Sequence, residues 1–192
     1  ARSCFAAIDE RDFDRPLTIC ACDNGALYNA ADFETQFSSC DILVWGATGH
    51  PAAKQKPEMF SWIDADAQGN VSRVSLKKPL QNTAVDPIVT GTFSFRNAKI
   101  FSEAAQALFD SGLKVNGEYY VDALINVAID LGYSVKLFTV DHYIGWGTPD
   151  ELRSYLYWQT CFDKWEYHPY RIEQDERVTN DGKKRLMLEN DD

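Results

Sequence analysis

The sequence lacks long apolar runs, paired cysteines and an excess of basic residues. No apolar run among the 192 residues approaches the ~20 residues that a membrane-spanning helix needs, so we expect no membrane segment. The charged N-terminal stretch does not resemble a signal peptide. Lysine and arginine number 19 against 29 acidic residues, which gives a net charge of −10. Because phosphate backbones reward clustered cations, this balance argues against general nucleic-acid binding.

The cysteines do not have the spacing of metal sites or of disulfide frameworks. The five cysteines are odd in number, and no two of them have CxxC spacing. We therefore expect reduced thiols and a cytoplasmic location. Metal ligation by cysteine is disfavoured because the ligand spacing is missing.

The order of apolar segments predicts an α/β fold. Strand-like and helix-like segments alternate, which favours a mostly parallel sheet between helices. Residues 17–22 are apolar on both faces, which suits the middle of such a sheet, and residues 49–59 are expected to form a loop. One domain is expected over residues 1–165, followed by a polar, mobile tail over 166–192. Strands are expected at 17–22, 41–47, 86–95 and 133–140, a hairpin within 60–79, and helices at 29–37, 97–112, 119–132 and 148–165.

The first candidate site follows the strand predicted at 17–22. Asp23, Asn24 and Gly25 come directly after it, and ligands of open α/β sheets bind beyond the carboxyl ends of strands. A carboxylate there can hold a hard divalent cation, an amide can bond a polar ligand, and a glycine allows close approach. Asp-Asn-Gly is equally good turn chemistry, and the tripeptide alone favours a turn.

Two further segments could meet a ligand. Lys77 and Lys78 are neighbours, so on a strand they would point to opposite faces, and one of them could meet a phosphate. A plain exposed pair is the simpler interpretation. Gly91 interrupts the apolar strand "IVTGTFSF", which indicates either a bulge or a ligand lying against the backbone at Val89, Thr90 and Gly91.

The segment "NGEYYVDALIN" carries two acidic residues near a predicted helix start. Glu118 and Asp122 are four apart and share a face. The helix dipole alone explains Asp122. Glu118, just after Asn116 and Gly117, is the better candidate for bonding ligand hydroxyls. Farther on, "GTPDEL" is a helix-entry signal, with Thr148 as N-cap and a proline at the first position.

Taken in order, these elements resemble the sugar-1-phosphate nucleotidylyltransferases, also called NDP-sugar pyrophosphorylases. Each motif is weak alone, and their order from about residue 16 to 156 is what is specific. The motifs are "CDN", "KKP", "VTG" followed by aromatics, "NGEYYVDALIN" and "GWGTPDEL".

The resemblance implies a fold, a reaction and roles for the residues. The fold would be a Rossmann-like, three-layer α/β/α arrangement with a mixed, mostly parallel sheet, of the GT-A type. The reaction would join an NTP to a sugar 1-phosphate, or a similar small phosphorylated alcohol, and release pyrophosphate. Asp23 and Lys78 would be catalytic, Asp23 by holding Mg²⁺ and Lys78 by neutralising the sugar phosphate. The substrate would contact Asn24, Val89, Thr90, Gly91 and Glu118.

Two features depart from the family pattern. The family begins with a glycine-rich loop that carries an arginine and is followed by a lysine, and nothing before Asp23 resembles it. We therefore expect this chain to be the C-terminal part of a longer enzyme, inactive without the N-terminal half of the same polypeptide. The family often places a second metal carboxylate two residues before the Gly-Thr of the last motif. Here that position is Gly145, and Asp141 is nearby but displaced.

Two other functions stay open. One is a non-catalytic sugar- or nucleotide-binding module that kept the fold. The other is a GT-A glycosyltransferase, which needs an Asp-x-Asp metal motif. The triplet Asp64 to Asp66 precedes a glycine turn and is typical of a hairpin, so this alternative ranks last. The aromatic residues predicted on the last helix hint at a partner surface, such as a homo-oligomer contact.

Overall fold

The fold is described by a computed structural model over residues 1–115 and 117–165. Contacts divide the chain into two compact units, Ala1–Ile144 and Gly145–Asp192, and each is described by itself. Among the described residues, no helix is long and apolar enough to cross a lipid bilayer.

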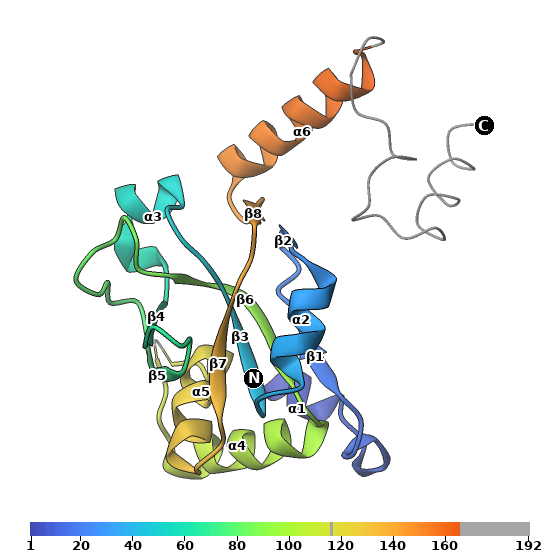
Figure 1. Cartoon of the computed structure of the whole chain (residues 1–192), viewed down its shortest axis with the longest axis vertical. Coiled ribbons are helices and arrows are strands. Elements are labelled where there is room, and N and C mark those ends of the chain that lie inside the picture. The colour runs from blue at the N-terminus through green and yellow to red at the C-terminus, as the bar shows by residue number, and fades with distance from the viewer. Residues whose placement is uncertain (116, 166–192) are drawn as a thin grey trace. The chain divides into compact units, whose positions relative to one another are not determined.

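A six-stranded mixed sheet forms the centre of the first unit (Figure 1). Its strands follow the order β5-β4-β6-β3-β7, and β1 also pairs with β6. The sheet is built from β1 (Leu17–Ile19), β3 (Ile42–Ala47), β4 (Trp62–Ala65), β5 (Val71–Ser75), β6 (Ile88–Phe95) and β7 (Val135–Thr139). The strands β2 (Asn24–Leu27) and β8 (His142–Gly145) form a separate two-stranded sheet.

Most strands of the sheet run in one direction, as expected for the mixed α/β class. β3 and β7 pair in parallel, and β1, β3 and β4 all pair antiparallel to β6. Thus β1, β3, β4 and β7 share a direction, and β5 and β6 run against it. The reversed strand β6 lies in the middle of the sheet and pairs with three of the strands that share a direction. Most neighbouring pairs are therefore antiparallel, although most strands run the same way.

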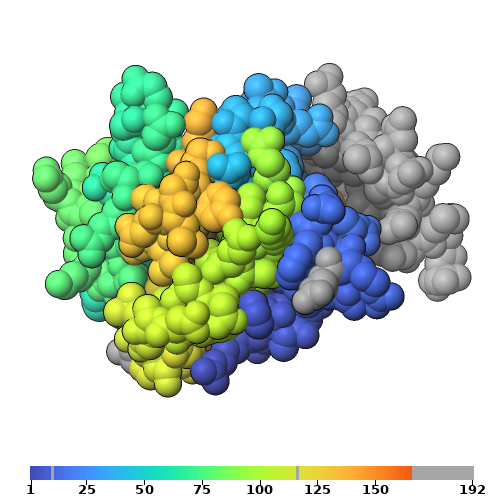
Figure 2. Space-filling view, turned by 90° about the horizontal axis from the view of Figure 1, so that it is seen from below, coloured from blue at the N-terminus to red at the C-terminus, as the bar shows by residue number. Residues whose placement is uncertain are grey.

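Helices cover both faces of the sheet and complete three layers. One core lies between β3, β6 and the helices α4 (Ala98–Ser111) and α5 (Val121–Asp130). The other core lies on the opposite face, where α2 (Ala30–Phe37) and α3 (Pro51–Gln55) pack. Figure 2 shows the blue N-terminal segment, with α1 (Arg2–Ala6), beside the yellow-green α4. Two 3-10 turns, η1 (Glu10–Asp12) and η2 (Pro57–Met59), complete the first unit.

Three expectations about individual elements are wrong. The first strand ends at Ile19 instead of residue 22, and it pairs antiparallel with β6 instead of lying inside a parallel sheet. The segment 24–27 is a strand that the sequence did not predict. Residues 49–59 are not a plain loop but contain α3 and η2. Pro51 and Pro57 occupy the first turn of these helices, a position that tolerates proline because its N–H needs no partner.

In the second unit, α6 (Pro149–Asp163) begins as predicted. The Thr148 hydroxyl accepts from the Glu151 amide at 3.3 Å, and the Glu151 carboxylate accepts from the Thr148 amide at 3.0 Å. This reciprocal capping box satisfies two amides that a helix start leaves unpaired. The predicted tail over 166–192 lies outside the described residues.

Candidate functional site

The Asp23 corner lies between β1 and β2. Asp23 is exposed, and its Oδ1 accepts a hydrogen bond from Asn24 Nδ2 at 3.3 Å. Asn24 begins β2, which pairs with β8. The chain thus makes a turn-like corner whose carboxylate is accessible and whose amide is oriented by its neighbour. Both interpretations of the tripeptide, a turn and an accessible carboxylate, describe this geometry.

Gly91 brings the central strand against that corner. The pairing of β3 with β6 shifts register between Val44 and Gly46, opposite Gly91, and Gly91 has a φ of 89°. Its carbonyl accepts from the Ala21 amide at 3.0 Å. A Cβ placed on Gly91 would lie 3.0 Å from the Ala21 Cβ and 3.4 Å from Asn24 Nδ2. The bulge predicted for this glycine is present. The group that comes close to its backbone is Ala21, and contact of a ligand with Val89, Thr90 and Gly91 stays a prediction.

Val89 and Thr90 can offer a ligand little except their backbone. Both residues are buried, and the Thr90 hydroxyl donates to the Trp45 carbonyl at 3.1 Å. The Val89 amide donates to the Ser61 carbonyl at 2.8 Å. A sugar lying over this segment would therefore meet the strand near Gly91 instead of the side chains of Val89 and Thr90.

The two adjacent lysines have different surroundings. β5 ends at Ser75, so Lys77 and Lys78 lie in a turn and not on a strand, and the expectation of opposite strand faces is wrong. Lys77 is the one described non-glycine residue with positive φ, at 54°, and its Nζ donates to the Met59 carbonyl at 2.5 Å. Lys78 is exposed, and its carbonyl accepts from the Ser75 hydroxyl at 2.8 Å. The side chain of Lys78 therefore extends from a turn that its neighbours hold.

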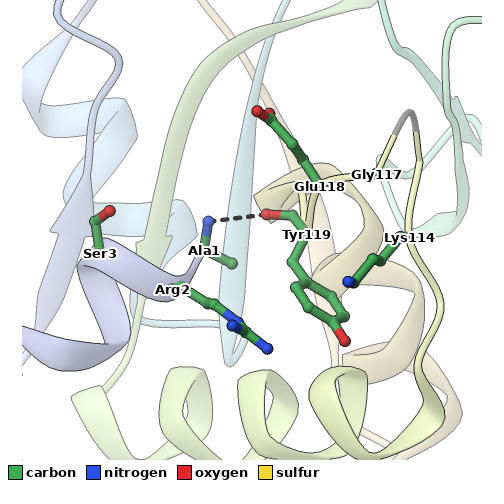
Figure 3. A pocket seen from close by; sticks show the side chains of 7 residues that line it. All are labelled: Ala1, Arg2, Ser3, Lys114, Gly117, Glu118 and Tyr119. Carbon is green, nitrogen blue, oxygen red and sulfur yellow. Dashed lines mark hydrogen bonds between the residues drawn. The ribbon is translucent and has the colours of Figure 1, made fainter.

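Glu118 lines a pocket on the N-terminal side of α5 (Figure 3). Glu118 lies opposite Val115, and the two residues pair through backbone hydrogen bonds of 2.9 and 3.0 Å. The pocket has a volume of about 350 Å³. In Figure 3 the Glu118 carboxylate points away from the cations Arg2 and Lys114, and its exposure leaves it accessible. The pocket is lined by Ala1, Arg2, Ser3, Lys114, Gly117, Glu118 and Tyr119.

A metal at Asp23 would have one carboxylate as its protein ligand. Within residues 1–115 and 117–165, no three histidine, cysteine or acidic side chains gather around a common point. Mg²⁺ keeps several waters and is often bound by one or two carboxylates together with substrate phosphates. The accessible Asp23 carboxylate fits that mode, but the arrangement is not a preformed metal cage.

Asp122 is a residue whose surroundings the sequence did not reveal. Burial raises the pKa of its carboxyl group, and this effect exceeds the opposing effects of the Ser61 hydroxyl and the Lys77 ammonium. Ser61 is 3% exposed. A carboxyl group with a raised pKa next to a lysine and a predicted substrate strand is a feature of functional sites. The helix-dipole interpretation of Asp122 is therefore incomplete.

The Asp-x-Asp triplet belongs to a hairpin, as its position predicted. Asp66 accepts from the amides of Gln68 and Asn70 at 2.9 and 2.8 Å, and from Asn70 Nδ2 at 2.9 Å. The Asn70 side chain makes the largest contribution to lowering the pKa of Asp66. Gly69, with a φ of 79°, completes the turn between β4 and β5. Because its oxygens close this turn, Asp66 is poorly suited to a metal.

Comparisons with solved structures confirm the fold. The chain superposes on a nucleoside-diphosphate-sugar pyrophosphorylase from Vibrio cholerae RC9 with a TM-score of 0.58 and 18% identity, covering 74% of this chain and 56% of that one. For a putative glucose-1-phosphate thymidylyltransferase from Bacillus anthracis the TM-score is 0.59, with 15% identity and coverages of 80% and 58%. For the inositol-1-phosphate CTP transferase from T. maritima it is 0.57, with 15% identity and coverages of 83% and 60%.

The proteins that match in sequence have more varied names, and each match covers only part of both proteins. The bifunctional protein GlmU of Lactobacillus gasseri is 28% identical over 123 residues, which is 63% of this chain and 26% of that protein. The translation initiation factor IF-2 of Orientia tsutsugamushi is 26% identical over 136 residues, covering 59% of this chain and 16% of that protein. No model of a known protein family matches. The described chain thus has the Rossmann-like fold of sugar-phosphate nucleotidyltransferases and spans only part of each relative's length.

Proposed function

We propose that this chain is the acceptor-binding part of a nucleotidyltransferase that acts on a sugar 1-phosphate or a similar small phosphorylated alcohol. The observation that carries the proposal is the contact of the Asp23–Asn24 corner with the bulge at Gly91. This contact sets the Asn24 amide beside the backbone of Gly91, and the exposed Asp23 carboxylate directly precedes Asn24 and accepts a hydrogen bond from it. The matching fold supports the class of reaction, and the pyrophosphorylase and transferases named above act on nucleotides and sugar or inositol phosphates.

The proposed reaction is an in-line displacement at the α-phosphorus of an NTP. A phosphate oxygen of the acceptor forms a bond to this phosphorus, and the bond from phosphorus to the bridging oxygen breaks. Pyrophosphate leaves with the electron pair. Such a transfer depends on positioning and on neutralising charge more than on covalent help.

Each predicted residue has a role in that scheme. Asp23 would hold Mg²⁺, which would supply charge neutralisation between the phosphates of the two substrates. Lys78 would bond the acceptor phosphate, and Asn24 would bond a polar group of the substrate. The backbone at Val89, Thr90 and Gly91 would lie under the acceptor ring, with Glu118 accepting from its hydroxyls. The reduced cysteines favour the cytoplasm as the place of action.

The experiment compares two acidic residues in the full-length protein. Pyrophosphate release is measured with each NTP and with glucose 1-phosphate or inositol 1-phosphate as acceptor. Asp23→Ala should lower kcat by roughly 10²- to 10³-fold, the loss typical of removing a group that stabilises transition-state charge. Asp64→Ala, which changes an exposed carboxylate on β4, should leave kcat within about twofold.

The opposite pattern would contradict the proposal. Loss of activity with Asp64→Ala and not with Asp23→Ala would favour a glycosyltransferase. A second candidate, a non-catalytic binding module, is favoured by the single carboxylate at the corner and by Gly145 at the position of the second one. Binding of the phosphorylated acceptor without any pyrophosphate release by the full-length protein would support that candidate.

A further inference from the structure

One face of α5 docks onto the end of β5, just before the lysine turn. Asn126 reaches the backbone of Val74, where its Oδ1 accepts from the Val74 amide at 2.8 Å and its Nδ2 donates to the Val74 carbonyl at 2.9 Å. The side chain thereby pairs with β5 as a neighbouring strand would. The next residue, Ser75, ends the strand, so Asn126 fixes the point from which the turn departs.

Asp122 lies one helical turn before Asn126 on the same face of α5. Lys77 is held in the left-handed region at a φ of 54°, a conformation that is strained for a non-glycine residue and persists only where the surroundings enforce it. Its ammonium bonds the Met59 carbonyl, and its charge acts on Asp122. The Ser75 hydroxyl closes the turn onto the Lys78 carbonyl.

Ser61 links the surroundings of the same carboxyl group to the predicted substrate strand. The Ser61 hydroxyl acts on Asp122, and the Ser61 carbonyl accepts from the Val89 amide at 2.8 Å. Asp122 shares the face of α5 from which Asn126 reaches the end of β5, so it lies on the side of the helix that meets the strand before the lysine turn. It also follows Glu118 by four residues.

We propose that Asp122 and Asn126 are positioning residues, which hold the turn of Lys77 and Lys78 in place for an acceptor phosphate. Asn126 fixes the end of β5, and Asp122 orients Lys77, so that the left-handed turn presents Lys78. This inference rests on the proposed function for its ligand, although the holding of the turn does not depend on that ligand. It also gives a role to Asp122 and Asn126, the first and last residues of the segment "DALIN" that follows Glu118.

The test uses the isotope-labelled 192-residue chain and three variants. Asp122→Asn removes the charge with little change of shape, and Asn126→Asp removes the donor to Val74. Asp130→Asn is the matched control, because Asp130 is an exposed carboxylate at the end of the same helix. The readouts are the amide resonances of Lys77 and Lys78, the affinity for glucose 1-phosphate and for inorganic phosphate, and the melting temperature.

We expect Asp122→Asn to move both lysine amide resonances and to weaken glucose 1-phosphate binding roughly tenfold, a loss typical of removing a residue behind a ligand-binding group. Its melting temperature at neutral pH should stay equal or rise, because a carboxyl whose pKa is raised in the folded state destabilises that state when ionised. A merely structural role would instead lower the melting temperature without a separate effect on affinity. Asn126→Asp should move the same resonances. Asp130→Asn should change neither these resonances nor the affinity for glucose 1-phosphate.

Two outcomes separate the inference from the proposed function. If Asp122→Asn shifts the amide resonances of Lys77 and Lys78 no more than Asp130→Asn does, the positioning role is overturned, whatever the chain binds. If the wild-type chain binds neither glucose 1-phosphate nor inorganic phosphate while those resonances do move, the proposed function fails and the holding of the turn stands.

Discussion

Gly91 is the residue at which the candidate site depends most directly on backbone conformation. Gly91→Ala should destabilise the fold by about 1–3 kcal/mol, because alanine is strained at positive φ and its Cβ would come within 3.0 Å of Ala21. Urea unfolding monitored by tryptophan fluorescence measures this change. The same variant should weaken acceptor binding, since Asn24 lies 3.4 Å from the added carbon.

Gly112 provides the matched control for that variant. It also has a positive φ, of 66°, but an added Cβ would meet no atom within 4 Å. Gly112→Ala therefore measures the backbone strain alone, and we expect it to cost less than Gly91→Ala and to leave acceptor binding unchanged. Equal costs for the two variants would show that the approach of Ala21 and Asn24 contributes nothing.

At the scale of residues, the sequence predicts what depends on local chemistry. An isolated glycine in an apolar strand indicated the bulge at Gly91, and the turn residues around Gly69 predicted a hairpin. The anchoring of Lys77 was beyond such reasoning. Its partners Met59 and Asp122 are remote in the sequence, and the fold alone brings them together.

At the scale of elements, Asp41 and Ser134 join the starts of the parallel strands β3 and β7. The Ser134 amide and hydroxyl both donate to Asp41 Oδ2, at 2.9 and 2.6 Å. Burial raises the pKa of Asp41, but the bonds from Ser134 and the charge of Arg96 outweigh burial and leave this pKa below its ordinary value. The ionised carboxylate therefore stabilises the folded state.

The pH dependence of this pair has a definite sign. Because the pKa of Asp41 is lowered on folding, its stabilising contribution is present above the ordinary value of 3.8 and is lost as the pH falls below it. Asp41→Asn should lower the free energy of unfolding by about 1 kcal/mol at pH 7, and by less at pH 3. Urea unfolding at the two pH values measures the difference, with Asp130→Asn as the control. A cost that is the same at both pH values would contradict this account.

Element types were easier to predict than their partners. The amphipathic pattern of residues 97–112 predicted α4, and the helix-entry signal at Thr148 predicted α6, whose cap at Thr148 is present. The place of β1 was missed, because an apolar segment is equally compatible with a central parallel strand and with an antiparallel partner of β6. The helices at Pro51 and Pro57 were missed because proline was taken to interrupt structure at a position where it begins a helix.

At the scale of the whole molecule, we propose that the described chain carries the acceptor side of the site. It spans 56–60% of the solved nucleotidyltransferases described above. The exposed aromatic residues of α6, which include Tyr157 and Trp158, leave the expectation of a homo-oligomer as a prediction. The net charge of −10 disfavours polyanions in general, so an anionic substrate must be bound by a few local cations.

The last prediction concerns which of the two substrates the 192-residue chain binds. The glycine-rich loop that grips the nucleotide in the resembling family has no counterpart before Asp23, whereas the segments proposed to hold the acceptor are all present. We therefore expect NTP to bind with a dissociation constant on the order of 1 mM or larger, which corresponds to a binding free energy of about −4 kcal/mol or less favourable. Glucose 1-phosphate or inositol 1-phosphate should bind more tightly than NTP.

Isothermal titration calorimetry of each NTP and each acceptor, with Mg²⁺ present, makes the comparison. Lys78→Ala should weaken the binding of the acceptor and leave the binding of NTP unchanged. Micromolar NTP binding by this chain would show that the described residues include a nucleotide site, and the division of the two substrates between separate halves would then be wrong.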